Sequence, residues 1–234
     1  MGILSRATAL SGWTALSATL GYTAWTRRSK IEALSPHDYL FGTTLFARYN
    51  PNNAPTTSDL CLRRVPLDQI QPELLEDANR GGTKLVESFC AGLWSGWGYA
   101  CQRSYLSRNC KGASTATHLW SIEELKTSGY APGTQITDRF EVISKTRRSI
   151  ILRRGDSPRN SGFREHDGLL EMSADVNKEE GCVEFGMKSI FYNALEEAPI
   201  DGNTAAGPLG PWAQWLHQQY EKVLMETAIK ACVR

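Results

Sequence analysis

The strongest constraint on the fold is a period-two pattern of apolar residues between positions 167 and 192. If the two halves of this segment pair as an antiparallel hairpin, Met172 faces Met187 on an apolar face. Glu171 then faces Lys188 on the opposite face, as an opposite-charge cross-strand pair. A slip of one residue would mix the two faces and lose this charge pair. The pattern therefore predicts the hairpin in this register, with Glu171 and Lys188 as a solvated pair on the outer face.

The rest of the chain predicts further strands and helices around this hairpin. Period-two patterns predict a strand over 59–65 and a second hairpin formed by 136–143 and 149–154. Helical patterns predict a long buried helix over 84–106 and a terminal helix from Pro211 onward. In the second hairpin, Phe140 is expected opposite Leu152. Strands followed by a long helix predict an α+β domain, in which a curved antiparallel sheet grips the C-terminal helix and leaves an internal apolar cavity.

The N-terminal region divides from the main domain at a turn-rich stretch. We expect residues 1–49 to form a hydrophobic, membrane-associating segment, 50–58 a linker, and 59–234 the ligand-cavity domain. Residues 7–26 carry no charge and are followed by Arg27 and Arg28. Three interpretations stay open: a helix packed on its own domain or on a membrane surface, a membrane anchor, or a transit or secretory signal.

Composition excludes several functional classes. The 26 Lys and Arg nearly balance the 25 Asp and Glu, and no basic run with interleaved aromatics predicts a nucleic-acid partner. No phosphate-binding loop, metal-ligand spacing or Ser-His-Asp pattern occurs, so we expect no cofactor and no metal. Seven Trp in this length favour a core or pocket for a flat, hydrophobic small molecule.

The candidate catalytic residues are polar groups at the rim of the predicted apolar face. His166 has the parity of Leu170 and should point to that face near one end of its strand, with Asn193 as its neighbour and Ser189 further in. Such a group could donate or carry a proton. The alternative is a rim histidine that is bonded to a backbone carbonyl.

The candidate substrate-binding residues are large apolar side chains on the helices and strands that would enclose the cavity. Each of them has plain core packing as the alternative. They are Trp94, Trp97, Met172, Met187, Phe191, Trp215 and Tyr220.

Three stretches of the second half resemble a known superfamily. They read GTQITDRFEVISKTRRSIILRRGDSPRNSGFREHDGLLEMSADV, then VEFGMKSIFY, then WLHQQYEKVLMETAI. Together with the order of elements they resemble the START-like, or Bet v 1-like, helix-grip superfamily. The amino-acid sequence of these stretches resembles an uncharacterised fungal group within it. The resemblance covers roughly residues 58 to 234. It implies binding of lipids, steroids or polyketides, and in some members cyclisation or isomerisation of natural products, but no catalytic motif is carried over.

Three functions follow as hypotheses. The first is a cofactor-free cyclase or isomerase, such as a pericyclase or intramolecular Diels–Alderase, acting on a hydrophobic polyketide or terpenoid in fungal secondary metabolism. Its pocket would fold the substrate into a reactive shape. The second is an intracellular lipid or sterol binding and transfer protein, which could be held at a membrane through residues 7–26. The third is a structural or assembly factor whose core is filled.

Overall fold

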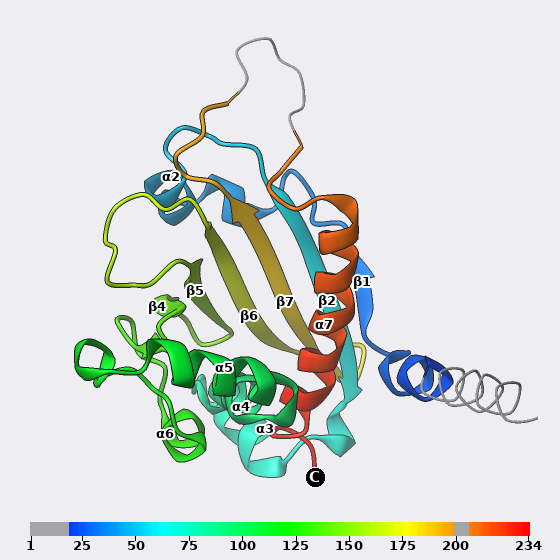
Figure 1. The fold of residues 1–234 in the computed structure, drawn as a ribbon. Coiled ribbons are helices and arrows are strands. Elements are labelled where there is room, and N and C mark those ends of the chain that lie inside the picture. The colour runs from blue at the N-terminus through cyan, green and yellow to red at the C-terminus, as the bar shows by residue number, and fades with distance from the viewer. Residues whose placement is uncertain (1–18, 199–205) are drawn as a thin grey trace, which may run out of the picture.

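The computed structural model describes residues 19–198 and 206–234, and within them it confirms an α+β architecture with a curved antiparallel sheet beside a C-terminal helix (Figure 1). The strands run in the spatial order β1-β2-β7-β6-β5-β4-β3. Their bounds are β1 Lys30–Glu32, β2 Thr57–Pro66, β3 Gln135–Ile136, β4 Phe140–Lys145, β5 Ser149–Gly155, β6 Asp167–Asn177 and β7 Cys182–Tyr192. The helices are α2 Thr44–Tyr49, α3 Pro72–Asn79, α4 Lys84–Ser95, α5 Ala100–Cys110, α6 Ile122–Thr127 and α7 Pro211–Ile229.

The register of the β6–β7 hairpin is confirmed. Met172 pairs with Met187, and Glu171 pairs with Lys188. The prediction of a solvated outer pair was wrong, because the Glu171 residue is only 3% exposed. The Lys188 Nζ lies 3.1 Å from a Glu171 oxygen and 2.9 Å from a carboxylate oxygen of Asp38, which belongs to the N-terminal region.

The outer face of the sheet is covered by residues from the N-terminal region. Leu34, Leu40 and Phe46 are buried there against Ile190 and Tyr192, in a second apolar core separate from the main one. A chain segment more than a hundred positions away thus replaces the water that the period-two pattern predicts on this face. The strand alternation signals which side chains share a face, but not what covers that face.

The β4–β5 hairpin has a different register from the predicted one. Val142, not Phe140, pairs with Leu152, and the register shifts between Val142 and Ser144. Such a bulge inserts one residue and re-aims the side chains beyond it. The difference from the predicted register is already present beside the turn, where Lys145 pairs with Ile150. Phe140 pairs with Arg154, whose side chain shares the inner face with that of Leu152.

The helices cover the inner face. The predicted helix over 84–106 ends its first part at Ser95, because Gly96 adopts an extended backbone, and resumes as α5. A Cβ on Gly92 would lie 2.2 Å from the carbonyl oxygen of Ala228, so this glycine lets α4 and α7 approach backbone to backbone. The main core lies between these helices and the sheet.

The described part of the N-terminal region joins the same body. Residues 19–26 are helical, and the Tyr22 hydroxyl donates to the carbonyl of Gln219 on α7 at 3.0 Å. Strand β1 then pairs with β2, which begins at Thr57, inside the predicted linker. Residues 7–18 of the predicted membrane-associating segment lie outside the described residues. Among those described, no helix combines the length and apolar character needed to cross a bilayer.

Candidate functional site

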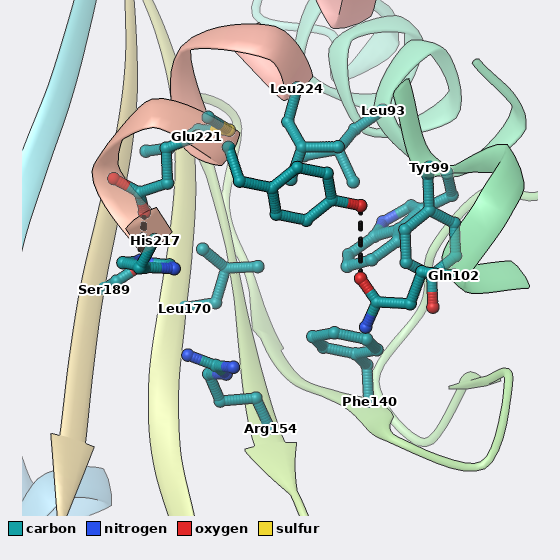
Figure 2. Close-up of a pocket in the computed structure, with 13 residues that line it drawn as sticks. Leu93, Tyr99, Gln102, Phe140, Arg154, Leu170, Ser189, His217, Glu221 and Leu224 are labelled. Carbon is teal, nitrogen blue, oxygen red and sulfur yellow. Dashed lines mark hydrogen bonds and ion pairs between the residues drawn. The ribbon is translucent and has the colours of Figure 1, made fainter. Parts of the chain in front are cut away.

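A pocket of about 150 Å³ lies on the inner face of the sheet and opens to solvent on one side (Figure 2). Strands β4, β5, β6 and β7 form its floor, and helices α4, α5 and α7 form its walls. The residues that line it are Leu93, Trp94, Tyr99, Gln102, Phe140, Arg154, Leu170, Met187, Ser189, His217, Tyr220, Glu221 and Leu224.

One side of the pocket is aromatic. The ring of Trp94 lies 4.5 Å from that of Phe140 and 5.1 Å from that of Tyr99, measured between centroids. The Tyr220 hydroxyl donates to the Gly98 carbonyl at 3.2 Å and lies 3.1 Å from Gln102 Oε1, which ties α7 to the start of α5. This side offers flat apolar surface to a ligand and fixes the spacing of the two helices.

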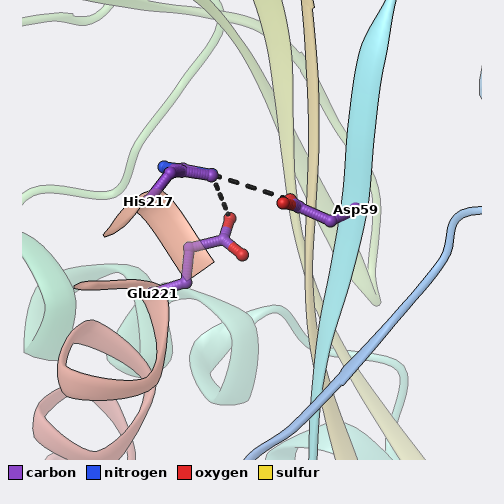
Figure 3. A group of neighbouring side chains, drawn as sticks. All are labelled: Asp59, His217 and Glu221. Atoms are coloured by element: carbon purple, nitrogen blue, oxygen red, sulfur yellow. Dashed lines mark ion pairs between the residues drawn. The ribbon is translucent and has the colours of Figure 1, made fainter. Parts of the chain in front are cut away.

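The opposite side carries a group of four polar side chains. His217 and Glu221 lie one turn apart on α7, with 3.0 Å between Nε2 and Oε1. The hydroxyl of Ser189, on β7, donates to the same Glu221 oxygen at 2.5 Å. Asp59 of β2 is the cross-strand partner of Ser189, and its Oδ1 lies 3.6 Å from His217 Nε2 (Figure 3). Two strands and one helix therefore bring a histidine, two carboxylates and a hydroxyl together.

Burial perturbs the protonation of this group. Asp59 is 1% exposed and Glu221 is 2% exposed. Burial lowers the pKa of His217, but the adjoining carboxylates of Asp59 and Glu221 outweigh this and raise it to about 9. Burial raises the pKa of Glu221 above its ordinary value, although His217 and Ser189 oppose this. At neutral pH His217 is thus an imidazolium, and its other ring edge, with Nδ1, is turned away from the carboxylates (Figure 3).

Arg154 supplies a second cation to the pocket. Its guanidinium carbon lies 3.9 Å from the centroid of the Phe191 ring, and that ring packs edge-on against His217 at 4.7 Å. Burial lowers the pKa of Arg154 to about 10, against the opposing effect of Glu221 and Asp59. It therefore remains a guanidinium cation at neutral pH.

Asp59, His217 and Glu221 could also hold a divalent cation. Each offers one ligand atom, and these atoms all lie within 4.8 Å of one another. Imidazole and carboxylate are ligands that zinc and related metals accept. The same atoms equally suit a shared proton, since Glu221 Oε1 already accepts from Ser189 and faces His217 Nε2.

Four of the residues predicted from the sequence meet at this pocket: Ser189, Trp94, Met187 and Tyr220. The other predicted binding residues lie elsewhere. Met172 is buried in the main core, with its sulfur 3.4 Å from that of Cys90, and Phe191 packs behind the pocket against Arg154 and His217. Trp97 is 57% exposed and packs at a tilt against Trp25, and Trp215 is 47% exposed and stacks on Trp212.

The structure places His166 and Asn193 outside the pocket lining. The prediction that His166 points to the apolar face was wrong, because β6 begins only at Asp167 and the strand parity does not extend back to it. Its side chain is 77% exposed, with Nδ1 3.7 Å from an Asp156 oxygen. Asn193 follows β7 and bonds to Glu196 and the Leu195 amide in a turn.

The sequence interpretation missed Asp59, Arg154, His217 and Glu221. One signal was present: His217 and Glu221 are four positions apart in a predicted helix, which puts both on one face. That face borders the apolar stripe of the predicted helix. Arg154 shares the parity of Leu152 within β5, but its meeting with Asp59 of β2 depends on strand pairing between distant segments.

Comparisons of this chain with models of protein families, with curated proteins and with solved structures give no match.

Proposed function

We propose that this chain is a cofactor-independent isomerase or cyclase, which transfers a proton to a hydrophobic polyketide or terpenoid substrate in fungal secondary metabolism. The observation that carries the proposal is the position of the His217 ring, whose Nε2 lies against two buried carboxylates on the wall of a pocket that is aromatic on its other side. The resemblance to the helix-grip superfamily supports the same conclusion. We place the protein inside the cell.

The proposed chemistry needs only residues of the chain. Asp59 and Glu221 fix the orientation of the His217 ring and favour its protonated form. Its Nδ1 proton passes to a carbonyl oxygen or alkene carbon of the substrate, and a proton returns from the substrate to Nδ1 when the new double bond or ring is complete. Donation of this proton is the electrostatic assistance, and the aromatic side holds the substrate in a reactive shape.

The size of the pocket sets what it can enclose. Pockets for drug-sized ligands usually measure about 300–1,000 Å³, whereas this one measures about 150 Å³. It therefore encloses one ring or a folded part of the substrate, and a longer molecule extends through the open side. The alternative function, a sterol carrier without catalysis, needs a larger enclosed volume. It does not need a protonated histidine beside two carboxylates.

The test uses the fact that isomerases and cyclases leave the mass of their substrate unchanged. Deleting the gene in the organism that encodes it should make one metabolite disappear and a compound of equal mass accumulate. Purified protein should convert the second compound into the first, with and without a metal chelator. His217→Gln should reduce this conversion by about 10²–10⁴-fold, the usual contribution of general acid–base catalysis.

The control and the contrary outcomes are equally definite. His166→Gln replaces an exposed histidine outside the pocket and should leave conversion unchanged. If the two metabolites differ in mass, or if His217→Gln retains full conversion, the proposal fails. Conversion that a chelator abolishes and zinc restores would instead assign Asp59, His217 and Glu221 to a metal.

A further inference from the structure

Arg154, which is half-buried, differs from the buried arginines among the described residues, because its guanidinium has no acceptor of its own. Arg153 is held by both oxygens of Asp167, Arg63 by Glu226, and Arg164 by two backbone carbonyls. Each of these guanidinium groups is thus neutralised or hydrogen-bonded where it is buried. The guanidinium of Arg154 makes neither an ion pair nor a hydrogen bond with the part of the chain that the structure describes, and the side chain it contacts there is the ring of Phe191.

The position of Arg154 directs its donors into the pocket. It lines the pocket together with His217, and Figure 2 shows the guanidinium directed inward on the same side. The Phe191 ring covers one face of the guanidinium, so the free N–H groups lie around its edge. An edge-on guanidinium matches a planar carboxylate through two parallel hydrogen bonds.

The surrounding charges allow one additional negative charge. The acidic and basic side chains near Arg154 are those of Asp59, Glu221 and His217. Together with Arg154 they make two acidic and two basic groups, so acidic side chains do not outnumber basic ones around the pocket. A singly charged anion is therefore compatible with the site, whereas a phosphate dianion would face two carboxylates.

We propose that the ligand of this pocket carries a carboxylate, which Arg154 binds edge-on, and an apolar ring or chain that packs against Trp94 and Phe140. The inference names the substrate class and so rests on the proposed function for its biological meaning. Its physical content is a binding preference, which can be measured without any turnover.

The experiment compares two probes of nearly equal shape, benzoate and its neutral analogue benzamide. A cavity of about 150 Å³ has room for one benzene ring. Binding is measured at pH 7 by the fluorescence of the pocket tryptophan and by calorimetry. The wild-type protein should bind benzoate at least about 10-fold more tightly than benzamide, the magnitude of one charge-assisted hydrogen bond.

Substitutions of Arg154 test whether this residue causes the preference for benzoate over benzamide. Arg154→Gln should lower the affinity for benzoate by at least about 10-fold and leave that for benzamide unchanged, and Arg154→Lys should fall between, since lysine keeps the charge but not the planar fork. The matched control is Arg148→Gln, which removes an exposed arginine paired with Asp175 outside the pocket. Circular dichroism checks that each variant folds.

Two results would overturn the inference: equal binding, or no binding, of the two probes by the wild-type protein, and an unchanged benzoate affinity in folded Arg154→Gln. The first needs no variant, so a variant that fails to fold cannot leave the question open. Benzoate preference without isomerisation of any metabolite would refute the proposed function alone. Isomerisation that depends on His217, without benzoate preference, would refute the role of Arg154 alone.

Discussion

The half-buried His217 gives a quantitative prediction about how stability depends on pH. The pKa of His217 is raised from 6.5 to about 9 in the folded protein. A group whose pKa is raised by folding contributes stability that is fully present below its unfolded pKa, and that contribution is lost as the pH rises through the folded pKa. At 1.36 kcal/mol per pKa unit, the rise of His217 corresponds to about 3 kcal/mol of unfolding free energy. The raised pKa of Glu221 acts in the same direction, because the folded protein holds that proton more tightly too.

The assay is urea unfolding, followed by tryptophan fluorescence with a reducing agent present, at several pH values between 6 and 10. Wild-type protein and His217→Gln are compared, because their difference removes the contributions of the tyrosines and cysteines that both share. The difference should be largest at pH 6, the lower end of this range, and shrink by about 2–3 kcal/mol by pH 10. This corresponds to roughly 4–12 °C in melting temperature for a chain of this length.

His166→Gln serves as the control for loss of an exposed histidine. Its stability should run parallel to that of the wild type across the whole range. If the curves of wild type and His217→Gln were parallel instead, His217 would not be held as an imidazolium by its carboxylates, and the proton donor of the proposed mechanism would be absent.

Two further predictions concern packing and charge in the fold. Gly92→Ala should lower the unfolding free energy by about 1–3 kcal/mol, as overpacking does, because the added methyl would meet the backbone of α7. Thermal melts measure this loss. The control is Gly112→Ala, which should melt close to the wild type because no neighbour lies within 4 Å of its added Cβ. Asp167→Asn should cost about 3–5 kcal/mol in urea unfolding because it leaves Arg153 buried without its charge partner, whereas Asp175→Asn, at an exposed pair, should cost under about 1 kcal/mol. Equal losses in the two aspartate variants would contradict the importance of burial.

Helices and strands could be predicted where the spacing of apolar residues along a short stretch of the chain decides them. Alternation along residues 167–192 established the β6–β7 register, since one slip would place polar groups on both faces. The β4–β5 pairing was displaced, because the turn sets the register of a hairpin and the apolar pattern did not mark where this turn lies. The break at Gly96 was likewise missed, since a single glycine inside an otherwise helical pattern is often tolerated.

The candidate site shows a similar division. Ser189 and Tyr220 were placed at the pocket by face and parity, while His166 was not, because parity holds only within a strand. The group of Asp59, Ser189, His217 and Glu221 comes from three elements, two of them separated by more than a hundred residues along the chain. No periodicity within one element can indicate such a meeting.

The sequence by itself thus determined the fold class, the central hairpin and the face of each of its side chains, because alternation and helical spacing are properties of a few neighbouring residues. Only the tertiary structure decided which faces are covered and which polar groups meet. Residues 34–49 bury the outer face that the pattern assigned to water. Packing of α7 beside β2 and β7 adds the carboxylate of Asp59 and the hydroxyl of Ser189 to the local pair of His217 and Glu221, because burial and charge pairing depend on distances in space, which the order of residues along the chain does not specify.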